Sequence, residues 1–163
     1  MIKINILSDN YSSADSPAFL TEHGYSVYIE FGEKKILIDT GASDNFLKNA
    51  ERLGINISEI DLAVLSHGHR DHTGGLKHLI SQTHCPIYLS GNVFGKKFHS
   101  CRGDKGLRNI GTDLALLESG ELNPVEDLGY YLNFQDTHIF MKHIDFYRKY
   151  MENTVDGITV RMT

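Results

Sequence analysis

A short apolar run followed at once by a dense group of histidines constrains this chain more than any other feature. Residues 61–65 read Asp-Leu-Ala-Val-Leu, and residues 66–75 read Ser-His-Gly-His-Arg-Asp-His-Thr-Gly-Gly. The apolar run predicts a buried strand. The spacing of the apolar residues in 76–80 predicts a helix, with Thr73 as its N-cap. The polar group is therefore expected in the loop between a strand and a helix, at the edge where open α/β sheets bind their ligands.

The histidine group carries the donor atoms that transition metals prefer. His67, His69, Asp71 and His72 lie within six positions of one another, and imidazole and carboxylate are usual ligands of zinc. Without a metal, such closely spaced polar groups lose solvation and compete for partners. A polar surface loop that is rich in histidine by chance is the alternative. We predict a metal site at these four residues, with zinc as the first choice and iron or manganese as alternatives.

The order His-x-His-x-Asp-His after an apolar strand resembles the signature of the metallo-β-lactamase superfamily. The resemblance implies that His67 and His69 bind one metal ion and that Asp71 and His72 bind a second. It also implies a metal-dependent hydrolase that uses a metal-activated hydroxide. In this interpretation Asp71 is the catalytic residue, because it helps to orient the nucleophile.

Two earlier segments extend the resemblance. Residues 35–41, Lys-Ile-Leu-Ile-Asp-Thr-Gly, are similar to a strand-Asp-Thr-Gly element of the family, which implies that Asp39 supports the metal loop. Residues 22–26, Glu-His-Gly-Tyr-Ser, resemble a subgroup similar to dihydropterin-ribofuranosylaminobenzene phosphate synthases. That likeness implies a phosphorylated or pterin-like small-molecule substrate and places His23 at its pocket. A loop histidine without a role at the site is the alternative for His23.

The resemblance implies an α/β fold, a metallo-β-lactamase-like αβ/βα sandwich, in a single domain over residues 1–163. It covers about residues 1–110, whereas residues 111–163 form a divergent tail. The family also needs a third histidine for the first metal, a bridging aspartate and a late histidine, and the tail shows none of them in the family's context. We therefore expect the first half of the fold, with the second half missing or truncated.

An isolated first half is expected to be a weak enzyme and to leave a sheet face uncovered. We expect that face to be covered in a homodimer or by a partner that supplies the second half. A non-catalytic metal-binding half-domain, or a subunit of a split enzyme, is the alternative function. A remote alternative is a dimeric aspartic protease, because Asp39-Thr40-Gly41 also resembles the catalytic turn of that class. The protease hypothesis leaves the histidine group unexplained.

Composition places limits on the partners. The chain has 163 residues, of which 40% are hydrophobic and 23% charged, and its net charge is −5. A negative chain is not expected to bind nucleic acid through bulk electrostatics, and no apolar run is long enough for a membrane helix. Cys85 and Cys101 are the two cysteines, which favours reduced thiols and a cytoplasmic location over a disulfide framework.

Periodicity predicts the remaining elements. Alternating or continuous apolar residues predict four further strands, at residues 2–6, 25–31, 35–39 and 86–89. Helical spacing predicts a helix over residues 46–53 that ends at Gly54. It also predicts a helix over residues 140–151, which could pack in the core or present a surface to a partner.

Overall fold

The computed structural model describes residues 2–11, 19–90, 97–100, 106–125, 133–134, 137–138, 153–155 and 158–160. The chain divides into two compact units, Met1–Glu126 and Asp127–Thr163. The described part of the second unit consists of two short antiparallel hairpins, β9 (Asn133–Phe134) with β10 (Thr137–His138) and β11 (Asn153–Val155) with β12 (Ile158–Val160). The helix predicted over residues 140–151 lies outside the described residues.

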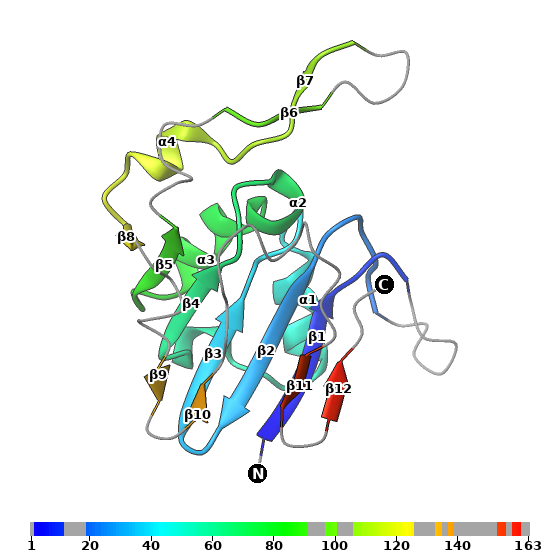
Figure 1. Ribbon diagram of the computed structural model, residues 1–163, viewed down its shortest axis with the longest axis vertical. Helices are drawn as coiled ribbons and strands as arrows, with labels where there is room; N and C mark the ends of the chain where they lie inside the picture. Colours follow the sequence, from blue (N-terminus) through cyan, green and yellow to red (C-terminus); the bar gives the residue numbers. More distant parts are fainter. Residues whose placement is uncertain are drawn as a thin grey trace. The chain divides into compact units, whose positions relative to one another are not determined.

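The first unit is built on a six-stranded mixed sheet in the order β1-β2-β3-β4-β5-β8 (Figure 1). Its strands are β1 (Ile2–Ser8), β2 (Ser26–Phe31), β3 (Lys34–Ile38), β4 (Leu62–Leu65), β5 (Ile87–Ser90) and β8 (Leu122–Val125). The first three strands are antiparallel, and β3, β4, β5 and β8 run parallel to one another. The strands predicted from the apolar pattern are confirmed.

The turn between β2 and β3 explains why these two strands form a hairpin. Gly32 has a φ of +60°, a conformation that residues with a Cβ rarely adopt. The register that follows pairs Tyr28 with Leu37, and both side chains are almost completely buried. A slip of one residue would turn these apolar side chains to the other face of the sheet.

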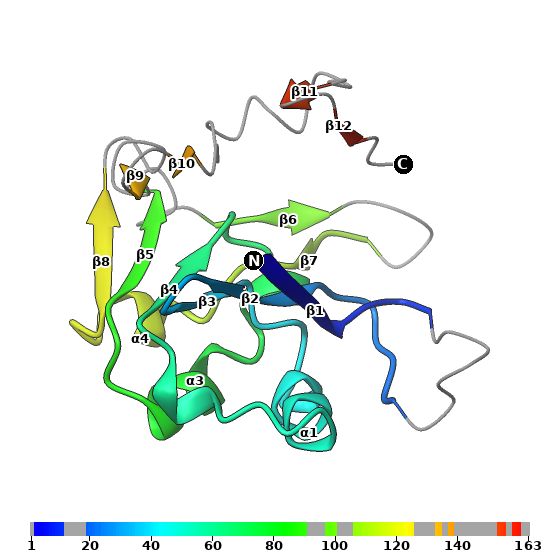
Figure 2. The ribbon, with the colours of Figure 1, turned by 90° about the horizontal axis from the view of Figure 1, so that it is seen from below.

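Helices cover the face of the sheet that carries Tyr28 and Leu37. Figure 2 shows α1 (Asn45–Arg52) and α3 (Leu76–Gln82) on the same side of the sheet. Phe46 of α1 and Leu79 of α3 are fully buried in the core that the helices share with the sheet. A buried phenylalanine or leucine of this kind contributes about 1.5–3 kcal/mol to the free energy of unfolding.

The end of α1 is fixed by its glycine, as the sequence predicts. Gly54 has a φ of +70°, and its N–H donates to Glu51 O at 3.0 Å while Ile55 N–H donates to Ala50 O at 2.8 Å. This is the hydrogen-bond pattern of a Schellman motif, which satisfies the last carbonyl groups of a helix. The chain then reaches β4 through a short 3₁₀ turn, Ile57–Glu59.

The helix predicted to start at Thr73 begins earlier and is interrupted. A four-residue helix, α2 (Arg70–Thr73), follows His69 directly, and α3 begins only at Leu76. Thr73 is therefore not an N-cap: its hydroxyl donates to His69 O at 2.9 Å within α2. Such a bond to the carbonyl four residues earlier competes with the capping geometry.

Between β5 and β8, the described residues form a small hairpin and a short helix. The hairpin pairs β6 (His99–Ser100) with β7 (Arg108–Asn109), and α4 spans Leu114–Leu117. Within the ranges that the structure describes, none of the helices combines the length and the apolarity needed to cross a membrane.

Candidate metal centre

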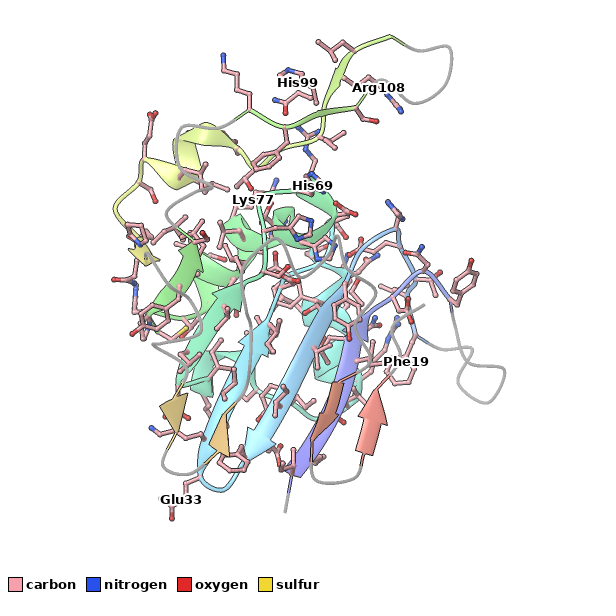
Figure 3. The ribbon with its side chains drawn as sticks, viewed as in Figure 1. Phe19, Glu33, His69, Lys77, His99 and Arg108 are labelled. Atoms are coloured by element: carbon pink, nitrogen blue, oxygen red, sulfur yellow. The ribbon has the colours of Figure 1, made fainter. Side chains whose placement is uncertain are left out.

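His67 and His69 lie where the sequence predicts, between the carboxyl end of β4 and the amino end of α2. Asp71 and His72, which were predicted in the same loop, lie within α2 itself. His69 is the N-cap residue of α2, with extended backbone angles (φ −84°, ψ 146°), so the chain turns sharply after it. Figure 3 shows the side chain of His69 at this end of the sheet. A loop that is anchored by a buried strand and a helix can hold ligand side chains in a defined arrangement.

The three imidazoles of this loop are close neighbours. The ring of His67 is 4.5 Å from that of His69 and 4.1 Å from that of His72, measured between centroids. Phe98 lies edge-on to His69 at 5.2 Å and so bounds the group on one side. The structure therefore brings the three predicted histidine ligands together.

Asp39 connects this loop to the end of β3. Its Oδ1 accepts from Ser66 N at 2.7 Å, and its Oδ2 accepts from Ser66 Oγ at 2.7 Å and lies 2.8 Å from His72 Nδ1. Asp39 is 1% exposed and has a φ of +57°, a left-handed conformation that costs most residues about 1–2 kcal/mol. A buried carboxylate with these partners suits a support for the metal loop and does not suit a protease carboxylate that must meet a substrate.

The same contacts orient two of the rings. The carboxylate of Asp39 accepts from His72 Nδ1, so in the neutral ring Nε2 is the nitrogen that carries the lone pair. The hydroxyl of Ser66 donates to Asp39 and therefore accepts from His67 Nδ1, 2.9 Å away. His67 thus also carries its lone pair on Nε2. A histidine that is fixed in this way is typical of metal ligands.

Burial and charge set the protonation of these histidines. Burial, followed by the charge of His72, lowers the pKa of His67 to about 4. Burial also lowers the pKa of His72, but the hydrogen bond and the charge of Asp39 outweigh it and raise that pKa above its ordinary value. At pH 7 His67 is therefore neutral, and a neutral imidazole has a lone pair to offer a metal.

Asp71 and His23 lie at the outer side of the group. The side chain of Asp71 is 28% exposed; its Oδ2 lies 3.8 Å from His72 Nε2 and 3.4 Å from His23 Nε2. His23 is 82% exposed. The structure thus places His23 beside the loop, at its solvent-facing edge, where a ligand of the site could reach it.

The donors are gathered but do not form a closed coordination sphere. Across the described parts of the chain, no three His, Cys, Asp or Glu side chains have their donor atoms arranged as a metal-binding group. The donor chemistry nevertheless fits a transition metal, because three imidazoles and one carboxylate share the loop and two of the rings are oriented by Asp39 and Ser66. The loop therefore carries suitable ligands, although the carboxylate of Asp71 lies closer to His23 than to His72.

Glu22 is a structural anchor of the site that no sequence pattern indicates. Its Oε1 accepts from Ser8 Oγ at 3.0 Å, from Ala42 N at 2.9 Å and from Ser43 N at 3.3 Å, and its Oε2 accepts from Asn45 Nδ2 at 3.1 Å. One carboxylate therefore ties β1 to the turn that follows Asp39. No local pattern could have revealed this, because the partners lie 14 to 23 positions away in the chain.

Three glycines allow these segments to approach one another. A Cβ added at Gly24 would meet Asp71 O at 2.6 Å, one at Gly74 would meet Ala42 O at 2.2 Å, and one at Gly75 would meet Thr40 O at 2.3 Å. Each of these distances is too short for a real Cβ. The position of Gly74 and Gly75 at the start of the predicted helix already indicates a close backbone approach there, whereas no local pattern indicates one at Gly24.

Comparison with known proteins identifies the family. The family model of the metallo-beta-lactamase superfamily matches residues 21–130, which include Asp39 and the whole histidine loop. A 7,8-dihydropterin-6-methyl-4-(β-D-ribofuranosyl)-aminobenzene-5′-phosphate synthase of Methanocaldococcus jannaschii is 38% identical over 104 residues, or 60% of this chain and 35% of that protein. A metal-dependent hydrolase of Staphylococcus aureus is 31% identical over 97 residues, or 56% of this chain and 40% of that protein.

A solved structure agrees with these relatives. The crystal structure of Tm1679, a metal-dependent hydrolase of the β-lactamase superfamily, matches with a TM-score of 0.60 and 32% identity, over 77% of this chain and 42% of that chain. The chain thus spans about a third to under half the length of these relatives. The fold, the histidine loop and these matches together show that the chain belongs to the metallo-β-lactamase superfamily.

Proposed function

We propose that this chain carries the metal-binding part of the active site of a metal-dependent hydrolase. The observation that supports the proposal is the group of three imidazoles at the end of β4, two of them oriented by Asp39 and Ser66. In the proposed arrangement His67 and His69 hold one metal ion. Asp71 and His72 hold a second, so that a complete site contains up to two ions, with zinc as the first choice and iron or manganese as alternatives.

The chemistry of the site divides between the metal and the chain. A bound zinc ion would polarise an ester or carbonyl oxygen and lower the pKa of water. Asp39 keeps the Nδ1 proton of His72 in place and so maintains the ring orientation. Asp71 is the proposed catalytic residue, because its partly exposed carboxylate can accept a hydrogen bond from the attacking water. His23, beside Asp71, is proposed to contact the substrate.

The proposed substrate is a small phosphorylated or pterin-like molecule. Support comes from the relative of Methanocaldococcus jannaschii, whose name refers to a pterin and a 5′-phosphate. The alternative is a metal-binding half-domain, or a subunit of a split enzyme, without activity of its own. This alternative is supported by the share of the relatives that the chain spans, 35% of one and 40% of another.

We also propose that the face of the sheet opposite the helices meets another polypeptide. Ile4, Ile29, Ile36 and Leu62 are cross-strand neighbours on that face, and Ile4 is 63% exposed. Ile36 in the same row is only 2% exposed, so a second copy of the chain, or a partner that carries the second half, would cover the exposed end of the row at β1. We expect this assembly in the reducing cytoplasm, where a free thiol such as that of Cys85 persists.

Hydrolysis of bis(4-nitrophenyl) phosphate tests the proposed function. We expect the purified chain to show weak turnover that depends on added zinc and falls about 100-fold in Asp71→Asn. Asp44→Asn is the matched control, because Asp44 is paired with Lys48 on α1, away from the loop. Turnover that survives both a chelator and Asp71→Asn would contradict the proposed function. Robust turnover by the monomer would contradict the need for a second half.

A further inference from the structure

A pocket of about 480 Å³ lies beside the metal loop but is lined by none of its histidines and not by Asp71. Volumes of this size are typical of sites for small molecules. The walls come from the turn after β3, α2, the start of α3, β7, the segment before α4, and α4 itself. The residues that matter for its chemistry are Arg70, Lys77, Asn109, Thr112, Asp113 and Leu116.

Two cationic side chains give this pocket a positive character. Arg70 belongs to α2 and Lys77 to α3, and both are exposed. Figure 3 shows Lys77 at the same end of the sheet as His69. Within the described residues neither cation has a carboxylate partner, whereas the lysines of β3 and α1 form ion pairs. Asp113 offsets one charge, and its Oδ1 already accepts from Ala115 N at 3.0 Å.

One amide donor and one apolar side chain complete the lining. The Oδ1 of Asn109 accepts from Gly111 N at 2.8 Å, which leaves the NH₂ group of Asn109 as the donor available to a ligand. Leu116, which is partly buried, supplies apolar surface. Two cations, an amide donor and an apolar wall together suit a ligand with a charged end and a less polar body.

We propose that this pocket binds the phosphate group of a small phosphorylated molecule. The planar guanidinium of Arg70 can bind two phosphate oxygens, and Lys77 adds a point charge. A single phosphate fits better than a nucleic acid, because the chain as a whole has a net charge of −5 and would repel a long polyanion. The inference deepens the proposed function, because it rests on the proposed phosphorylated substrate, but it does not depend on a bound metal.

The pocket wall is bonded to the backbone of the metal loop. Thr112 donates to Gly68 O from its N–H at 2.9 Å and from its hydroxyl at 3.1 Å. Arg70 N–H donates to Ile110 O at 2.7 Å. Gly68 lies between the first two histidines of the loop, so a phosphate in the pocket is bound by the same segment that carries the proposed metal ligands.

Calorimetric titration of the metal-free protein with inorganic phosphate and with phenyl phosphate tests this proposal. We expect one saturable site per chain, binding that weakens as salt is added, and about tenfold weaker binding in both Lys77→Gln and Arg70→Gln. Lys3→Gln, which removes a charge from the far end of β1, should bind as the wild type does. Asp113→Asn should bind about twofold to fivefold more tightly, because it removes a repulsive charge and keeps the oxygen that accepts from Ala115.

The expected gain in phosphate affinity in Asp113→Asn distinguishes a direct effect on binding from damage to the fold, because a substitution that only disrupts the fold cannot improve affinity. Loss of affinity in Lys3→Gln equal to that in Lys77→Gln would overturn the proposal, as would the absence of saturable binding. Tighter binding of a single-stranded oligonucleotide than of phenyl phosphate, lost in Lys77→Gln, would overturn the assignment to a small molecule. Absence of phosphate binding would leave the zinc-dependent hydrolysis of the proposed function unaffected, so the two failures can be told apart.

Discussion

Asp39 adopts an unfavourable backbone conformation, and the hydrogen bonds of its side chain offset the energetic cost. The left-handed φ of +57° is unusual for a residue with a Cβ, but the carboxylate gains contacts with Ser66 and His72 and the backbone N–H donates to Val64 O at 2.8 Å. Hydrogen bonds to a charged group are worth about 1.5–3 kcal/mol each. They offset the strain and fix the end of β3 against the metal loop.

Replacing Asp39 by asparagine is a specific test of this role. Asparagine tolerates the left-handed region as well as aspartate does, so the backbone is not newly strained. The substitution removes the charge that orients His72, and we expect zinc affinity to fall about 10–100-fold, measured by competition with a chromogenic chelator. Asp44→Asn, which removes an exposed charge outside the loop, should leave the affinity unchanged. Equal affinity in wild type and Asp39→Asn would show that Asp39 does not support the site.

At the level of single residues, the sequence predicted the candidate metal ligands but not all the residues that hold them in position. The histidines and Asp71 are adjacent in the chain, so a local pattern is enough to find them, and Asp39 followed from the resemblance alone. Ser66 and Glu22 could not be recognised, because a serine or a glutamate has no local pattern that reveals partners far along the chain. Glu22, for example, bonds to Asn45 across 23 positions.

Among the elements, the break between α2 and α3 decides how closely the metal loop can approach the turn after β3. Thr40 N–H donates to His72 O at 2.7 Å, and Gly75 N–H donates to Gly41 O at 3.3 Å. These bonds require backbone to lie against backbone, which only glycine permits at the break. The sequence predicted one helix from residue 73, because apolar spacing describes which face is buried but not where two backbones must touch.

Substitution of Gly75 by alanine measures the energy of this contact. The new Cβ would meet Thr40 O at 2.3 Å and Ser43 O at 2.5 Å, and backbone oxygens cannot move aside easily. We expect the free energy of unfolding to fall by about 3 kcal/mol or more, measured by urea denaturation. Gly32→Ala is the control: it has a φ of +60° and no atom within 4 Å of the new Cβ, so its cost should be only about 1–2 kcal/mol. Equal costs would contradict the close packing at the break.

For the whole molecule, the sheet has two apolar faces, and the described helices α1 and α3 cover one of them. Alternation along β1 places Ile2, Ile4 and Ile6 together on the opposite face, exposed by 55%, 63% and 54%. Their strand lies at the edge of the sheet, and an exposed apolar edge favours association. The sequence predicted the sheet from local patterns, but a strand's solvent exposure depends on what else covers it, which no local pattern contains.

Association through this face can be tested by light scattering. We expect the purified chain to form a homodimer at micromolar concentration, or to be captured by a partner that carries the second half, and Ile4→Lys to shift the homodimer to monomer. Lys3→Ala is the control, since Lys3 points to the other face and pairs with Glu30 at 3.5 Å. A stable monomer in the wild type that binds no second-half partner would contradict the proposed assembly.

The metal content of the purified protein tests the central claim most directly. Elemental analysis of the wild type, isolated without chelators, should show between about one and two transition-metal ions per chain, with zinc predominant. The double variant His67→Ala/His69→Ala should lose most of this metal, whereas His78→Ala, on α3 outside the loop, should retain it. A wild-type protein without metal even after exposure to zinc, or a double variant that retains the wild-type content, would show that the histidine loop is not a metal centre.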